Sequence, residues 1–186
     1  MSNIIDLRSD TVTLPTDEMR NAIANAKLGD DVFQEDPTIN KLEKKASQIM
    51  GKEAGLLVPS GTMGNLVSIL VHCGRGTEII LGDKSHTFIY EAGGISSFGG
   101  IHSHQLRNND DGSIDLNSIK SAIRTENVHF PKSAAISLEN THNMCNGYPL
   151  SKDYSREVSH IAHENNIKLH IDGARIFNAA IAHETN

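Results

Sequence analysis

Apolar residues recur at helical spacing in two segments near the start of the chain. The first segment follows a Pro-Thr-Asp-Glu start at residues 15–18 and runs until Gly29. The second begins at Asp36 and Pro37, a typical cap and first-turn pair, and ends before Gly51. The apolar positions are Met19, Ala22, Ile23 and Ala26 in the first segment, and Ile39, Leu42, Ala46, Ile49 and Met50 in the second. The pattern therefore predicts two amphipathic helices.

From residue 54 onward, short apolar runs alternate with segments of helical spacing. The runs at 55–58, 78–81, 101–105, 134–138 and 168–171 have the length and composition of buried strands. The predicted helices between them lie at 63–70, 88–91, 116–123 and 151–165. This alternation predicts an α/β fold, a mainly parallel sheet with flanking helices on both faces. Ligands bind such sheets at the carboxyl ends of the strands, so we expect the chemically active residues just after them.

Composition and charge narrow the class of partner. Of the 186 residues 38% are apolar, and no run is long enough to span a bilayer, so no membrane partner is expected. The 17 basic and 23 acidic residues are interspersed, which argues against nucleic acid and favours a small molecule. Charged residues at Asp6, Arg8 and Asp10 interrupt any secretory signal, so a cytoplasmic location is expected. One domain without a linker is the prediction.

Cysteine and histidine spacing gives no metal or disulfide pattern. Cys73 and Cys145 form no CxxC pair, and two free thiols in a reducing compartment are the plain interpretation. Two histidine pairs, at 102 and 104 and at 160 and 163, have spacings that would let each pair share a face. No third ligand stands in pattern with them, so no metal is predicted.

The tripeptide Ser60-Gly61-Thr62 follows a predicted strand and opens a helix. Free backbone N–H groups, a hydroxyl and the helix dipole would favour an anion such as a phosphate there. The same tripeptide is also an ordinary capping turn, and neither GxxxxGK nor GxGxxG is present. The residues alone leave both interpretations open.

Asp172 closes the last predicted strand, and Arg175 follows three residues later. A carboxylate in this position can keep the ring nitrogen of a bound heterocycle protonated, which makes the ring an electron sink. An Asp–Arg pair that stabilises a turn fits the pattern equally well.

Seven motifs resemble, in order and spacing, those of the low-specificity L-threonine aldolases, which are fold-type I enzymes dependent on pyridoxal 5'-phosphate (PLP). The motifs are DLRSDTVT (6–13), GDDV (29–32), EDPT (35–38), SH (85–86), EAGG (91–94), LENTHN (138–143) and HIDGARIFNA (170–179). Together they cover essentially the whole chain. The resemblance implies the large domain of a PLP lyase that cleaves L-threonine or L-allo-threonine, an amino-acid substrate, to glycine and acetaldehyde. It also implies a homo-oligomer, dimer or tetramer, when full length.

The resemblance further implies a role for each matching residue. Cofactor-binding residues would be Gly61 and Thr62 at the phosphate, His86 stacked on the ring, Asp172 at the ring nitrogen, Glu139 in the pocket wall, and Arg175. His86 and His129 would be catalytic, while Ser9 and Arg175 would hold the substrate carboxylate. Histidines are more often structural, and a serine such as Ser9 can simply cap a turn.

Two departures from the family's pattern stand out. Phe33-Gln34 replaces the family's Tyr-Gly, so a phenol of the family's pocket is missing here. The lysine that binds the cofactor covalently in the family lies downstream of the Asp-Gly-Ala-Arg motif, and Lys84 and Lys152 do not stand in its position. Residues 1–186 would thus be an N-terminal arm plus an incomplete, C-terminally truncated PLP-binding large domain, with the C-terminal small domain absent.

Three expectations follow for the chain as given. It should bind PLP weakly and show little or no aldolase activity, because the covalent lysine is missing. It should be poorly soluble or oligomeric, because an incomplete sheet leaves apolar surface open.

Two alternatives to a threonine aldolase remain: a related PLP lyase acting on another β-substituted amino acid, and a non-catalytic truncated domain.

Overall fold

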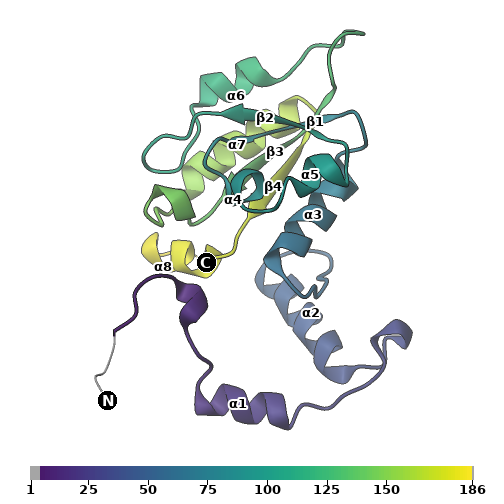
Figure 1. Ribbon diagram of the computed structural model, residues 1–186, viewed down its shortest axis with the longest axis vertical. Coiled ribbons are helices and arrows are strands. Elements are labelled where there is room, and N and C mark those ends of the chain that lie inside the picture. Colours follow the sequence, from purple (N-terminus) through teal and green to yellow (C-terminus); the bar gives the residue numbers. More distant parts are fainter. Residues whose placement is uncertain (1–4, 186) are drawn as a thin grey trace. The chain divides into compact units, whose positions relative to one another are not determined.

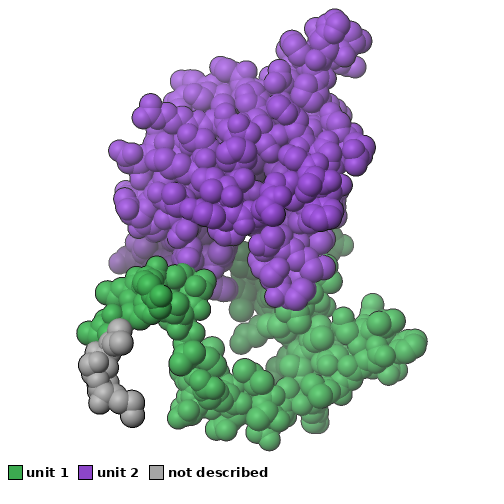
Figure 2. Space-filling view, in the orientation of Figure 1, with its two compact units in different colours: residues 1–57 green, residues 58–186 purple. Residues whose placement is uncertain are grey.

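The computed structural model describes residues 5–185, which divide into two compact units with the boundary between Leu57 and Val58 (Figure 2). The sequence predicted one domain with an N-terminal arm. The predicted domain limits of 1–186 include residues 1–4 and 186, which lie outside the described part.

The first unit contains the two predicted helices, α1 (Asp17–Ala24) and α2 (Pro37–Ile49), together with the short 3-10 turns η1 (Asp10–Val12) and η2 (Asp31–Phe33). Asp36 caps α2 as expected, since its Oδ1 accepts hydrogen bonds of 2.9 Å from the backbone N–H groups of Thr38 and Ile39. The hydrogen bonds from Ile39 and Gly29 lower the pKa of this carboxyl. The apolar stripes of both helices remain exposed within the described chain, at Met19, Ile23, Leu42 and Ile49 among others.

The strand predicted at 55–58 does not form, and this prediction was wrong. The backbone N–H of Leu57 donates 2.7 Å to the Oε1 atom of Glu43, and Gly55 lies against the Glu43 backbone. The segment is thus held by helix α2 instead of by a neighbouring strand, which an apolar run cannot reveal by itself.

The second unit is a four-stranded, wholly parallel sheet with the strand order β2-β1-β3-β4 (Figure 1). Its strands are β1 (Glu78–Gly82), β2 (His102–Leu106), β3 (Ser133–Glu139) and β4 (Lys168–Asp172). Its helices are α3 (Gly61–His72), α4 (His86–Ile89), α5 (Gly94–Ser97), α6 (Leu116–Ala122), α7 (Lys152–Glu164) and α8 (Ile176–Ala182), with a 3-10 turn η3 (Asn143–Cys145). The predicted α/β class is confirmed, while α5 and α8 were not foreseen.

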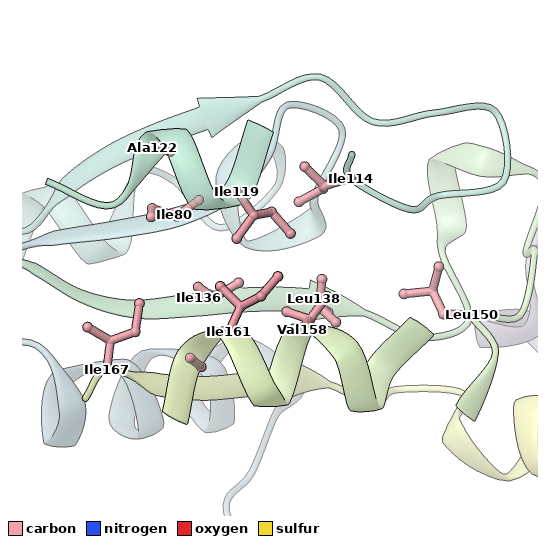
Figure 3. Close-up of a cluster of buried hydrophobic side chains, with 11 residues drawn as sticks. Ile80, Ile114, Ile119, Ala122, Ile136, Leu138, Leu150, Val158, Ile161 and Ile167 are labelled. Carbon is pink, nitrogen blue, oxygen red and sulfur yellow. The ribbon is translucent and has the colours of Figure 1, made fainter. Parts of the chain in front are cut away.

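Helices cover both faces of this sheet, as predicted. On one face Ile80 of β1 and Ile136 of β3 pack with Ile119 of α6 and with Val158 and Ile161 of α7 (Figure 3). On the other face, the neighbouring side chains of β1, Ile79 and Leu81, pack with Ile69 of α3 and Ile95 of α5. Alternate residues of one strand thus enter two separate apolar layers, which explains its unbroken apolar run.

The described residues also show the state of the two cysteines and the character of the helices. Cys73 and Cys145 are both free and buried, and burial raises the pKa of the Cys73 thiol to about 11. Within residues 5–185, none of the helices combines the length and apolar character needed to cross a membrane.

Candidate active site

The candidate site lies where β3 and β4 end and helix α3 begins. Glu139 and Asp172 are the last residues of their strands and are paired across the sheet. Asn65, in the second turn of α3, donates a hydrogen bond of 3.0 Å from Nδ2 to the Oδ2 atom of Asp172. This contact brings the start of α3 to the carboxyl end of the sheet, the position expected for a ligand site.

The carboxylate of Asp172 is half-buried and held on both oxygens. Its Oδ2 accepts from Asn65, and its Oδ1 accepts a bond of 3.3 Å from the backbone N–H of Ala174. Arg175 stands at the N-cap position of α8, partly buried, three residues further on. The structure thus places Asp172 at the end of β4 and Arg175 at the start of α8, on either side of the short turn that joins them.

His86 opens the short helix α4, and its ring is paired with Glu91. Nδ1 of His86 lies 2.9 Å from Oε1 of Glu91, and the same oxygen accepts a bond of 2.8 Å from Nδ2 of Asn65. The side chain of His86 is 39% exposed, whereas that of Glu91 is 4% exposed. The imidazole therefore stands at the open side of the site with a buried carboxylate behind it.

The carboxylate of Glu139 accepts hydrogen bonds from two backbone N–H groups beside the site. One carboxylate oxygen accepts a bond of 2.7 Å from the backbone N–H of His86, and the other accepts a bond of 2.9 Å from that of Asn143. Glu139 is buried, so these two bonds tie the loops that follow β1 and β3 to each other. Glu139 is thus placed to position His86, and its expected place in the wall of a cofactor pocket stays a prediction.

The start of α3 has the geometry of an anion site. Ser60 is the N-cap, and its Oγ accepts a bond of 3.1 Å from the N–H of Met63. Helix geometry leaves the N–H groups of Gly61 and Thr62 without intrahelical acceptors, and the space beside Gly61 is open. Asn65 follows Gly61 by four residues, or about 6 Å along the axis. An anion at the helix start would therefore lie roughly one helical turn from Asn65, the residue that donates to the Asp172 carboxylate.

Within the second unit, one predicted residue is not brought to this place. His129 lies in the exposed loop before β3, whereas the site lies after Glu139 at the other end of that strand, roughly 20 Å away for seven residues. Within a single chain His129 therefore does not reach Asp172. Ser9 belongs to the first unit, where its Oγ accepts a 3.2 Å bond from the N–H of Thr11 and caps η1. Its expected substrate role stays a prediction.

Sequence reasoning assigned no role to Asn65, Glu91 and His170. Nε2 of His170 lies 2.9 Å from Oδ1 of Asn65, so the three residues form one network with His86 and Asp172. Glu91 and His170 stood inside the motifs that carried the resemblance, which was the available signal. Asn65 could have been found only from its spacing of one helical turn after Gly61.

Among the described residues, one group of side chains has the spacing to hold a metal ion. Ligand atoms of His86, Glu91 and Asp172 lie within 4.8 Å of one another, but the amide of Asn65 already donates to both carboxylates. His102 and His104 do share a face of β2, where they lie 3.9 and 3.3 Å from the carboxylate of Glu78. That carboxylate is held by a guanidinium, which disfavours a cation there.

Comparison with known proteins extends this picture. A family model described as beta-eliminating lyase matches residues 6–186. Low-specificity L-threonine aldolase 1 of Arabidopsis thaliana is 53% identical over 181 residues, which cover 96% of this chain and 51% of the plant protein. The low specificity L-threonine aldolase of Escherichia coli is 43% identical over 180 residues, which cover 97% of this chain and 53% of the bacterial protein. The chain thus spans about half the length of the curated relatives it matches.

The fold is also shared with solved structures. The crystal structure of a candidate L-allo-threonine aldolase from Listeria monocytogenes superposes with a TM-score of 0.69 at 24% identity. The match covers 85% of this chain and 43% of the bacterial one, so the similarity concerns one part of that larger protein.

Proposed function

We propose, from the premise that this chain belongs to the beta-eliminating lyase family, that the protein is a PLP-dependent aldehyde-lyase of the threonine aldolase type. Its reaction would be the retro-aldol cleavage of L-threonine or L-allo-threonine to glycine and acetaldehyde. High identity to two curated threonine aldolases supports this choice of substrate. The observation that carries the proposal is the hydrogen-bonded group of Asp172, Asn65, Glu91 and His86 beside the open start of α3.

The residues present fit the cofactor. A carboxylate whose Oδ2 and Oδ1 are held from two sides is preorganised to face a protonated ring nitrogen, and Asp172 has this environment. The first N–H groups of α3 suit a phosphate, and Gly61 and Thr62 would hold it. His86, on the open side of the site, would cover the face of the ring.

The cofactor and the side chains of the protein would have separate roles in this reaction. PLP, when bound, supplies an electron sink for the electron pair left at Cα when the Cα–Cβ bond breaks. Asp172 would keep the proton on the ring nitrogen that makes this sink effective. His86 would take up the proton of the β-hydroxyl, with the charge that it gains stabilised by Glu91 at 2.9 Å. Arg175 and Ser9 would bind the substrate carboxylate, for which a guanidinium is well suited.

Such an activity would belong to amino-acid metabolism, where it would join threonine catabolism to glycine biosynthesis. We place the enzyme in the cytoplasm, in keeping with its two free, buried cysteines, and expect a homo-oligomer. Residues 1–186 would be an N-terminal arm and part of the PLP-binding large domain.

Binding of PLP to the 186-residue chain tests the proposal without requiring turnover. Equilibrium dialysis should show weak binding that Asp172→Asn weakens about tenfold, the equivalent of roughly 1.4 kcal/mol. Asp153→Asn is the matched control, because Asp153 is an exposed aspartate on α7 whose carboxylate pairs with Arg156 at 2.6 Å, away from the site. Equal PLP affinity in Asp172→Asn and the unchanged chain would refute the assignment.

A further inference from the structure

Both the NH2 group and the oxygen of the Asn65 side-chain amide have hydrogen-bond partners within the site. Its Nδ2 donates to Oε1 of Glu91 at 2.8 Å and to Oδ2 of Asp172 at 3.0 Å. Its Oδ1 lies 2.9 Å from Nε2 of His170. Asn65 is buried, so water is a poor substitute for any of these partners.

The chemistry of the partners fixes which way this amide points. Carboxylates only accept hydrogen bonds, so both must face the amide NH2 group. A flipped amide would set Oδ1 against two carboxylate oxygens at hydrogen-bond distance. The orientation of Asn65 is thus determined by Glu91 and Asp172, and its Oδ1 must face His170.

That orientation determines the proton position on His170. Because Oδ1 of Asn65 can only accept, Nε2 of His170 must donate. Burial lowers the pKa of His170, with a smaller contribution from His72 in the same direction and an opposing one from Asp172. A neutral ring that donates from Nε2 carries no proton on Nδ1.

The tautomer of His86 is fixed by Glu91. Its Nδ1 faces Oε1 of Glu91, which can only accept, so Nδ1 must carry a proton. In the neutral ring Nε2 then keeps its lone pair. Among the described residues no hydrogen bond ends on that nitrogen, so it is available on the open side of the site.

We propose that Asn65 is a positioning residue that sets the proton positions of this site. It holds the Asp172 and Glu91 carboxylates on one shared NH2 group and fixes His170 as the Nε2–H tautomer. Glu91, held by Asn65, in turn fixes the proton on Nδ1 of His86 and leaves its Nε2 as the proton acceptor. The use of that acceptor rests on the proposed function: the β-hydroxyl O–H bond would break, and an N–H bond would form at Nε2 of His86. The hydrogen-bond network itself is independent of any cofactor.

The tautomers can be measured directly in the unsubstituted 186-residue chain. After labelling of its ten histidines with 15N, long-range 1H–15N correlation spectra distinguish protonated from bare ring nitrogens. Spectra would be recorded well above the usual histidine pKa, with His86→Gln and His170→Gln used to assign the signals. We expect Nδ1–H at His86 and Nε2–H at His170. The opposite tautomer at either residue would overturn the proposal.

Substitution of Asn65 tests its role in setting these states. In Asn65→Ala, Nε2–H of His170 loses its acceptor, so we expect its single-tautomer signal to become that of an exchanging mixture. Asn117→Ala, at an exposed position of α6, should leave both histidine signals unchanged. An unaltered His170 tautomer in folded Asn65→Ala would contradict the proposal. If that variant does not fold, the measurement on the unsubstituted chain still decides.

The outcome is separable from that of the proposed function. The expected tautomers in a chain that does not bind PLP would support the role of Asn65 and contradict the cofactor assignment. The reverse tautomers in a chain that does bind PLP would overturn this inference and leave the proposed function standing.

Discussion

Asn65 and Asp172 are 107 positions apart in the sequence, and their side chains are joined by a hydrogen bond of 3.0 Å. The bond connects the first half of α3 to the end of β4. It therefore fixes the distance between the two ends of the candidate cofactor site, the helix start for the phosphate and the carboxylate for the ring nitrogen. Neither segment could set that distance alone.

Borohydride treatment of the chain with PLP should not trap the cofactor at one particular lysine. The reason is the expectation, drawn from the motif resemblance, that lysines such as Lys84 and Lys152 do not stand in the position of the family's covalent lysine. Mass spectrometry of the reduced product should show little labelling, spread over several exposed lysines. A reducible absorption band that maps to one residue would show that this chain holds PLP covalently.

Replacement of Glu78 should destabilise the second unit. Glu78 is fully buried at the start of β1, where it accepts bonds of 2.8 and 3.0 Å from Nε of Arg124 and a bond of 2.9 Å from Oγ of Ser133. In Glu78→Gln the guanidinium, whose side chain is 28% exposed, loses its ion-pair partner. We expect a loss of about 2 kcal/mol, below the usual cost for a wholly buried pair, measured by urea unfolding. Glu157→Gln is an exposed control on α7.

The same residue predicts a pH dependence of stability. Burial tends to raise the pKa of Glu78, but hydrogen bonds from Arg124 and Ser133, with the His104 ring 3.3 Å away, outweigh it and lower the pKa below 4.5. A lowered folded-state pKa gives stability that is present above the unfolded value of 4.5 and is lost as the pH falls through the folded value. The unsubstituted chain should therefore lose more stability than Glu78→Gln on acidification below 4.5. Parallel losses would contradict this.

Substitution of Gly112 by alanine should be costly for two separable reasons. Its φ of +81° is unfavourable for other residues, and an added Cβ would lie 2.6 Å from Cβ of His142, which is fully buried. Gly76 has a φ of +84° with open space around it. Gly76→Ala should therefore cost only the backbone strain, about 1 kcal/mol, and Gly112→Ala roughly 1–3 kcal/mol more. Equal unfolding free energies for the two variants would refute the packing argument.

The chain should self-associate through apolar side chains near its last helix. Phe177 and Ile181 of α8 are 60% and 79% exposed, and Ile171 of the edge strand β4 is 41% exposed. Exposed groups of this size favour association. In size-exclusion chromatography, Phe177→Ser with Ile181→Ser should shift the chain toward monomer. Asn178→Ser, an exposed polar position on the same helix, should have no effect.

Local patterns in the sequence determined most of the secondary structure of the second unit. Alternating apolar runs and helical stripes located four of the five expected strands and the longer helices, because each pattern depends only on residues close in the chain. The motifs also indicated His86 and Asp172 as residues of one site, and these two do share a hydrogen-bonded network.

What the tertiary structure decided depends on contacts between distant segments. The run at 55–58 became irregular because its backbone bonds to α2, and His129 fell at the far end of β3 because the direction of that strand places it there. The role of Asn65 appeared only once β4 stood beside α3. The periodicity of a segment indicates which of its faces is buried. The neighbours that a side chain contacts depend instead on the spatial order of the strands in the sheet.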